Sequence, residues 1–156
     1  MNPATNPAIL LAGASGSAPN AKPTVLLVED DNYVSAAIWT LLKYSDYDVT
    51  IAESGAEGLK LAQSLSPDIV ILDVNLPDLN GLEICRRLKA DPGTAELPVV
   101  FFSGQSERAE EALKLGAEAF LVKPNDIIRL PDCLGQILAS RATAQGIAKP
   151  AGLACR

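Results

Sequence analysis

The sequence predicts a doubly wound α/β sandwich, in which helices cover both faces of a parallel β-sheet. Five short apolar runs alternate along the chain with segments whose apolar residues recur at helical spacing. The runs are apolar at nearly every position, which is typical of strands covered on both faces. Strands that alternate with helices in this way imply right-handed crossovers and helices on both sides of the sheet.

The strands are expected where the apolar runs lie, at residues 24–28, 48–52, 68–72, 98–102 and 119–122. The first helix is expected at residues 32–43. In chain order, the apolar residues expected to face the sheet from the five helices are Val34, Ile38, Leu41 and Leu42; Leu59, Ala62 and Leu65; Leu82, Cys85 and Leu88; Ala109, Ala112 and Leu113; and Leu134, Ile137 and Leu138. Gly116 follows the fourth helix, and Pro131 suits the first turn of the fifth.

One folded domain is expected at residues 23–141. The chain has 156 residues and 48% hydrophobic content, which is enough for a complete core without disulfides or structural metals. Residues 1–22 are rich in Ala, Pro, Asn, Ser and Gly and are expected to form a disordered tail. Residues 142–156, interrupted by Gly146 and Pro150, are expected to form a flexible tail or linker.

Charged residues follow three of the predicted strands. Asp73 closes the run at 68–72, Glu29 and Asp30 close the first run, and Lys123 follows the last. The carboxyl ends of parallel strands meet at one edge of the sheet, which is where doubly wound proteins bind ligands. A carboxylate cluster beside one lysine is therefore expected at this edge.

This cluster predicts phosphoryl chemistry with a divalent cation. Carboxylates 4 Å apart repel by roughly 4 kcal/mol per pair at an effective dielectric constant near 20, and Mg²⁺ in an open, partly hydrated site would compensate. Asp73 can then act as the nucleophile that forms an aspartyl phosphate. Lys123 supplies positive charge, and the hydroxyl of Ser103 can donate to a phosphoryl oxygen.

The composition excludes several other classes of site. The chain has no histidine, so any phosphohistidine must come from a partner. Histidine-based catalysis and metal sites with histidine ligands are also excluded. The formal net charge of -6 argues against a sequence-independent grip on nucleic acid.

The location of the protein is expected to be cytoplasmic. Cys85, Cys133 and Cys155 show no C-x-x-C spacing and are expected to be free thiols in a reducing compartment, the first two as small core residues. No apolar run is long enough to span a membrane. The stretch Ile9–Ala12 is too short for a signal sequence.

Four segments resemble the receiver domain of two-component response regulators, of the single-domain, chemotaxis-regulator-like kind. They are Val25–Asp31, Asp68–Gly81, Val99–Gly104 and Ala119–Pro124, and the resemblance covers residues 23–141. It implies a flavodoxin-like (βα)5 fold with strand order 2-1-3-4-5. It also implies that an aspartate accepts phosphate from a histidine kinase or a histidine phosphotransfer protein.

The resemblance assigns the phosphate and metal roles as follows. Asp73 matches the phosphoacceptor, while Glu29 and Asp30 match the acidic pair that holds Mg²⁺. Asn75 matches the position whose backbone carbonyl completes the metal site. Asp31 is expected to cap the first helix and not to bind metal.

The resemblance also assigns a switch. Ser103 matches the switch hydroxyl, Lys123 the lysine that binds the phosphoryl group, and Phe120 the switch aromatic, although an apolar aromatic in a strand is as readily a core residue. Pro124 is expected to carry a cis Lys-Pro bond.

Three functions remain open at this stage. The leading one is a phosphorylatable receiver without an attached effector, which signals to an unknown protein by contact and is not an enzyme beyond its own phosphorylation and dephosphorylation. The second is a receiver-like adaptor, or a receiver cut from a larger hybrid kinase or multidomain regulator. The third is a haloacid-dehalogenase-type phosphatase, which would need an aspartate where Asn75 stands.

Overall fold

The computed structural model describes residues 21–144, in which five parallel strands form one sheet of order β2-β1-β3-β4-β5. The strands are β1 (Thr24–Val28), β2 (Asp48–Ala52), β3 (Ile69–Leu72), β4 (Val99–Ser103) and β5 (Ala119–Val122). The predicted fold class and strand order are confirmed. The expected tail residues 1–20 and 145–156 lie outside the described range.

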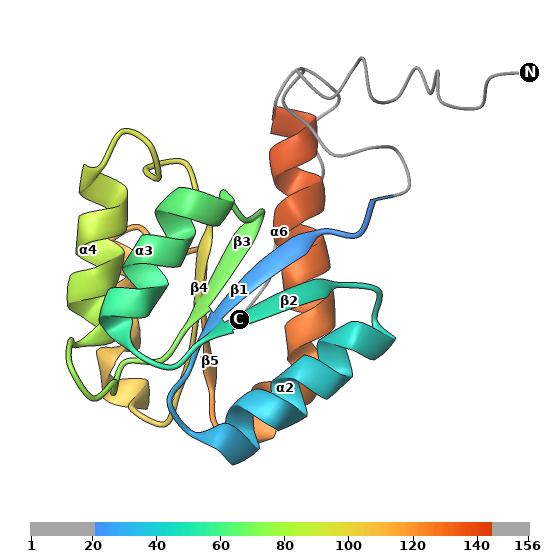
Figure 1. Cartoon of the computed structure of the whole chain (residues 1–156), viewed down its shortest axis with the longest axis horizontal. Helices are drawn as coiled ribbons and strands as arrows, with labels where there is room; N and C mark the ends of the chain where they lie inside the picture. Colours follow the sequence, from blue (N-terminus) through green and yellow to red (C-terminus); the bar gives the residue numbers. More distant parts are fainter. Residues whose placement is uncertain (1–20, 145–156) are drawn as a thin grey trace, which may run out of the picture.

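Helices cover both faces of the sheet (Figure 1). They are α2 (Asn32–Tyr44), α3 (Gly55–Leu65), α4 (Gly81–Ala90), α5 (Ala109–Lys114) and α6 (Leu130–Ala144), with 3₁₀ turns at Ser106–Arg108 and Asn125–Arg129. Helices α3, α4 and α5 pack on one face, and α2 and α6 pack on the other. Helix α6 continues past residue 141, where the domain was expected to end, because the chain has no glycine or proline between residues 136 and 145.

The core has two halves because alternate side chains of each strand point to opposite faces. Leu26 and Val28 of β1 pack into the half under α3 and α4, whereas Val25 and Leu27 pack into the half under α2 and α6. Helix α3 lies very close to β1, since a Cβ added at Gly58 would be 2.8 Å from Cγ2 of Val28.

Some expected core positions differ in the structure. Leu65 and Leu113 are half exposed, at 50% and 49%. The core is contacted instead by Leu59, Leu61 and Ala62 of α3 and by Ala109, Ala112 and Leu115 in and after α5. Cys85 and Cys133 are buried in the core as predicted. Cys85 is a free thiol, but Cys133 is disulfide-bonded, so the expected free thiol is wrong there. Cys155 is outside the described range.

The exposed side of α2 is unlike that of the other helices. Its large exposed side chains are aromatic: Tyr33 and Tyr44 are almost fully exposed, and Trp39 is partly so. By contrast, α4 exposes Arg86 and Arg87. Across residues 21–144, no helix combines the length and the apolar character that crossing a membrane requires.

Candidate functional site

Glu29 and Asp73 leave neighbouring strands side by side. Strands β1 and β3 pair in parallel with Val28 opposite Leu72, and each acid is the next residue. The backbone N–H of Asp73 donates to the carbonyl of Val28 (3.2 Å), and that of Glu29 donates to Ala52 (3.0 Å). The two carboxylates are therefore held in place by the sheet itself.

Lys123 joins the two acids from the end of β5. Its Nζ donates to Oε2 of Glu29 at 2.6 Å and to Oδ2 of Asp73 at 2.9 Å. The Glu29 and Asp73 side chains are only 2% and 8% exposed, and that of Lys123 is 20% exposed. The ammonium group also lies 5.8 Å from the ring centroid of Phe102, and the Lys123-Pro124 bond is cis as predicted.

Burial and hydrogen bonding act in opposite directions on the charged groups of the site. Desolvation raises the pKa of Glu29 above its usual value, although the hydrogen bond from Lys123 and the N–H of Asp31 act in the opposite direction. For Lys123, burial alone lowers the pKa, but its hydrogen bonds to Glu29 and Asp73 outweigh that effect and the pKa is raised. Lys123 and the N–H of Asp31 thus favour the charged form of Glu29 against the effect of burial.

The residues at this edge fit a divalent cation. Glu29, Asp30 and Asp73 each offer one oxygen, and these oxygens lie within 4.8 Å of one another. Three carboxylates and one ammonium leave a formal charge of -2. Asp30 is exposed while the other two acids are buried, so the cluster opens to solvent on one side, as a partly hydrated Mg²⁺ requires. Glu29, Asp30 and Asp73 are thus suited to hold it.

The remaining predicted site residues lie at the same edge. Ser103 is the last residue of β4, which pairs with β3; it is buried, and its Oγ accepts a hydrogen bond from the N–H of Gln105 at 3.3 Å. Asn75 is exposed, and its N–H points to Oδ1 of Asp73 at 3.4 Å. Asp31 caps α2, accepting hydrogen bonds from the N–H groups of Tyr33 and Val34, as predicted.

Phe120 is buried in the core. Its ring stacks on that of Phe101, with centroids 5.8 Å apart and planes inclined by 16°, and only 9% of the residue is exposed. The ring is therefore already packed inward. Its role as a switch stays a prediction.

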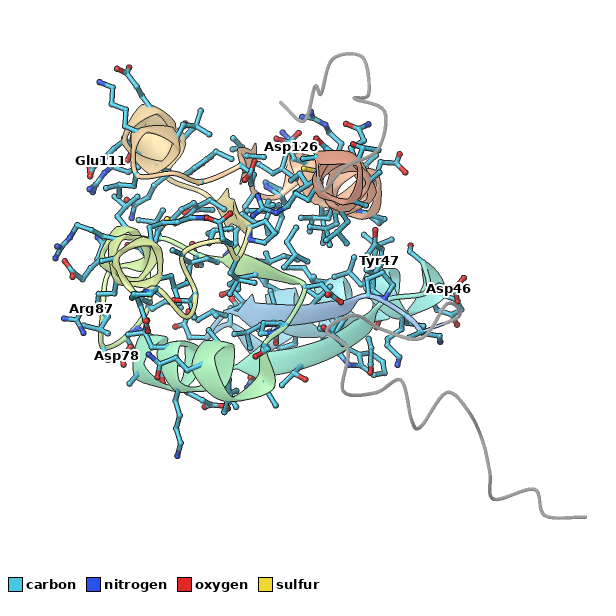
Figure 2. All side chains as sticks on the ribbon, turned by 90° about the horizontal axis from the view of Figure 1, so that it is seen from above. Asp46, Tyr47, Asp78, Arg87, Glu111 and Asp126 are labelled. Carbon is cyan, nitrogen blue, oxygen red and sulfur yellow. The ribbon has the colours of Figure 1, made fainter. Side chains whose placement is uncertain are left out.

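Sequence reasoning missed two acids that hold the loops carrying the site. Asp126 accepts a hydrogen bond from the N–H of Val122 at 2.8 Å and pairs with Arg129 at 3.1 Å, which fixes the turn after β5 around Lys123. Asp78 accepts hydrogen bonds from the first turn of α3. Figure 2 labels both acids, which come from different loops. In each case the carboxylate of a loop residue accepts hydrogen bonds from backbone N–H groups of another segment. We found no sequence motif that predicts these contacts.

Gly81 also has a role that the sequence did not show. A Cβ at this position would lie 2.0 Å from the carbonyl oxygen of Asp73, so any other residue would push the loop off the strand end. The N–H of Gly81 donates to Val74 at 2.7 Å. Glycine is needed at position 81 because the backbone of Asp73 lies so close, and not because the turn needs a positive φ.

The comparison with known families agrees with this geometry. The model of the response regulator receiver domain matches residues 25–134, which include the acids, Ser103 and Lys123. The chain belongs to this family.

Curated relatives of this receiver domain include complete regulators and a kinase. The DNA-binding dual master transcriptional regulator RpaA of Synechocystis sp. is 36% identical over 107 residues, which are 67% of this chain and 44% of RpaA. Histidine kinase P4 of Formosa agariphila is 36% identical over 122 residues, which are 77% of this chain but 9% of the kinase. The chain thus spans less than half the length of these relatives.

Solved structures share the fold over nearly their whole length. The receiver domain of the Francisella response regulator 1452 has a TM-score of 0.70 and 30% identity, and the match covers 77% of this chain and 98% of that one. The receiver domain of the sensor histidine kinase PA1611 of Pseudomonas aeruginosa has a TM-score of 0.70 and 27% identity, covering 77% and 100%. That structure has a magnesium ion coordinated in its active site cleft.

Proposed function

We propose that Asp73 is the phosphoacceptor of a two-component phosphorelay and takes its phosphoryl group, with Mg²⁺ bound, from a histidine kinase or a histidine phosphotransfer protein. The observation that carries the proposal is the buried contact of Lys123 with both Glu29 and Asp73. Because the chain has no histidine, the donor's phosphohistidine must belong to the partner. The phosphorylated domain then signals by contact with another protein.

The attacking atom is best assigned to Oδ1 of Asp73. Lys123 holds Oδ2, whereas Oδ1 has only the long contact with the N–H of Asn75. Oδ1 forms a bond to phosphorus while the bond from phosphorus to the donor's histidine nitrogen breaks. That nitrogen keeps the electron pair and takes a proton from solvent, and an acyl phosphate remains on Asp73. A carboxylate attacks without losing a proton, so this chain needs no general base.

Two groups of the chain act on the transferred phosphoryl group, and four further residues would hold Mg²⁺ beside it. The ammonium of Lys123 balances its charge. The hydroxyl of Ser103 accepts a hydrogen bond from the N–H of Gln105, and its own proton can be donated to one of the phosphoryl oxygens. Glu29, Asp30, Asp73 and the backbone carbonyl of Asn75 would hold Mg²⁺. Bound Mg²⁺ supplies further positive charge at the phosphoryl oxygens.

The direct test is intact-mass measurement with a small acyl phosphate and Mg²⁺. Wild type should gain one phosphate when Mg²⁺ is present. It should gain none when Mg²⁺ is chelated before the donor is added. Asp73→Asn keeps the shape of the side chain but lacks the nucleophilic oxygen, so it should gain none. Labelling of Asp73→Asn at the wild-type level, or an unlabelled wild type, would refute the proposal.

The exposed aromatic face of α2 supports a protein donor. The helix begins directly after Asp31, and Tyr33, at 89% exposure, is therefore close in sequence to the acidic site. Large exposed apolar side chains on one helix are typical of contact surfaces between proteins. Tyr33→Ala and Tyr44→Ala should slow phosphotransfer from a kinase while leaving labelling by a small acyl phosphate unchanged. Equal slowing with both donors would argue against docking on α2.

The context of the domain is part of the same proposal. The chain can act as a separate receiver or as a receiver joined to other domains, as in its longer relatives. We propose that it is not an enzyme beyond its own phosphorylation and dephosphorylation, since Asn75 stands where a phosphatase of the dehalogenase type needs its second aspartate. Steady release of phosphate from a monoester by the purified protein would contradict this.

A further inference from the structure

Asp78 connects the loop after Asp73 to a helix far away in the sequence. Its Oδ1 accepts a hydrogen bond from the N–H of Gly55 at 2.7 Å, and its Oδ2 accepts one from Ala56 at 2.8 Å. Both donors are in the first turn of α3, where backbone N–H groups have no partner within the helix. Oδ1 also accepts a hydrogen bond from the N–H of Leu79 at 2.9 Å, which fixes the orientation of the carboxylate.

A second feature shows that the loop and α3 are built to touch. A Cβ added at Gly55 would lie 2.7 Å from Cδ1 of Ile84 and 2.9 Å from Cβ of Leu79. Real Cβ atoms do not approach so closely, so the contact requires a residue without a side chain. Figure 2 shows Asp78 between α3 and α4.

The other end of the same loop closes on Asp73 itself. Gly81 packs against the carbonyl of Asp73, and Oδ1 of Asn80 accepts a hydrogen bond from Leu82 to start α4. The segment 74–77, which includes Asn75, is therefore held between Asp73 on one side and Asp78 on the other.

We infer that Asp78 is a positioning residue for phosphoryl transfer, acting through the loop of residues 74–80 on the backbone of Asn75 and on the orientation of Asp73. The inference rests on the proposed function. Asp78 touches neither the phosphoryl group nor its donor. Its carboxylate sets where the Asn75 carbonyl lies by tying the loop to α3.

A matched pair of variants separates this role from ordinary capping. Asp78→Ala removes the tie between the loop and α3. Ser54 caps the same helix, and its Oγ accepts a hydrogen bond from the N–H of Glu57 at 3.2 Å. Ser54→Ala removes this cap but leaves the loop of residues 74–80 unchanged. Asp78→Asn keeps one oxygen that can still accept from Gly55 and Leu79, and so serves as the rescue.

Three measurements on the full chain give the readout. Without Mg²⁺ or donor, Asp78→Ala should shift the amide resonances of residues 74–76, and Ser54→Ala should not. The Mg²⁺ dissociation constant, from calorimetry, should rise about tenfold in Asp78→Ala, at the low end for residues that orient metal ligands. The rate of labelling by a small acyl phosphate at limiting Mg²⁺ should fall in parallel, and Asp78→Asn should lie between Asp78→Ala and wild type.

The inference is overturned if Asp78→Ala keeps the wild-type amide shifts and Mg²⁺ affinity, or if Ser54→Ala changes both as much. Should Asp78→Ala fail to fold, Gly55→Ala provides the second variant, because it forces α3 and the loop apart and should raise the Mg²⁺ dissociation constant in the same way. A wild type that takes up no phosphate would refute the proposed function. The amide and Mg²⁺ comparison would still decide the role of Asp78.

Discussion

Two groups of acids lie at the same edge of the sheet and experience opposite environments. Glu29 and Asp73 are buried and share one ammonium group, and desolvation raises the pKa of Glu29. Asp78 and Asp126 bind backbone N–H groups instead. Hydrogen bonds from Ala56 and Gly55 lower the pKa of Asp78, and one from Val122 lowers that of Asp126.

The two groups of acids differ in their effect on stability. The buried pair is costly to the apo fold, because each acid loses its water and the contacts with Lys123 and with one backbone N–H each replace only part of it. The loop acids stabilise, because they satisfy backbone groups that would otherwise lack partners. Buried charged groups that are unfavourable for folding, next to loop acids that stabilise the fold, are typical of a functional site.

The largest expected effect follows from removing the shared cation. Lys123→Met should lower the free energy of unfolding at neutral pH by about 3 kcal/mol, since removing one partner strands buried charge. Urea unfolding in the presence of a chelator measures it. The double variant Glu29→Gln with Lys123→Met should recover much of the loss. If Lys123→Met alone is as stable as wild type, the buried acids do not depend on Lys123.

A smaller effect distinguishes two adjacent acids. Mg²⁺ at 100 times its dissociation constant should stabilise wild type by about 2.7 kcal/mol, because it binds only the folded cluster. Asp30→Ala should lose this response, while its metal-free stability rises by about 0.5 kcal/mol or less, since Asp30 is exposed.

Asp31→Ala provides the control for the Mg²⁺ response. It removes the cap of α2 and should cost about 1 kcal/mol, yet keep the full response. Thermal unfolding with and without Mg²⁺ decides. A melting temperature of Asp30→Ala that climbs with Mg²⁺ as in wild type would contradict the assigned ligand.

The smallest effect is a difference in sign with pH. The folded pKa of Glu29 is above the usual glutamate value of 4.5, so the contribution of Glu29 to the stability of the metal-free protein should be lost as the pH rises from that value through the folded pKa. The folded pKa of Asp78 is below the usual aspartate value of 3.8, so its contribution should be present above that value and be lost as the pH falls through the folded pKa.

Urea unfolding at several pH values between about pH 3 and pH 7 would test this contrast. The stability difference between wild type and Glu29→Gln should fall with rising pH. The difference between wild type and Asp78→Asn should rise. Parallel trends for the two variants would mean that the two groups of acids do not differ as the structure indicates.

The sequence by itself determined the fold and the location of the site. Apolar runs that alternate with helical periods specify a parallel sheet covered on both faces, and such a sheet brings its strand ends to one edge. Glu29, Asp73 and Lys123 are each the next residue after a strand, so their meeting needed no knowledge of side-chain packing. Asp31 as a helix cap was equally local.

Only the tertiary structure decided what holds the site in place. The hydrogen bond from Gly55 to Asp78 spans 23 residues, and the close approach of Gly81 to Asp73 depends on how the loop folds back over the strand end. The inward packing of Phe120 likewise depends on Phe101 in the neighbouring strand. Periodicity and strand ends are properties of the local chain, whereas these contacts exist only once separate elements have packed, so no sequence pattern could specify them.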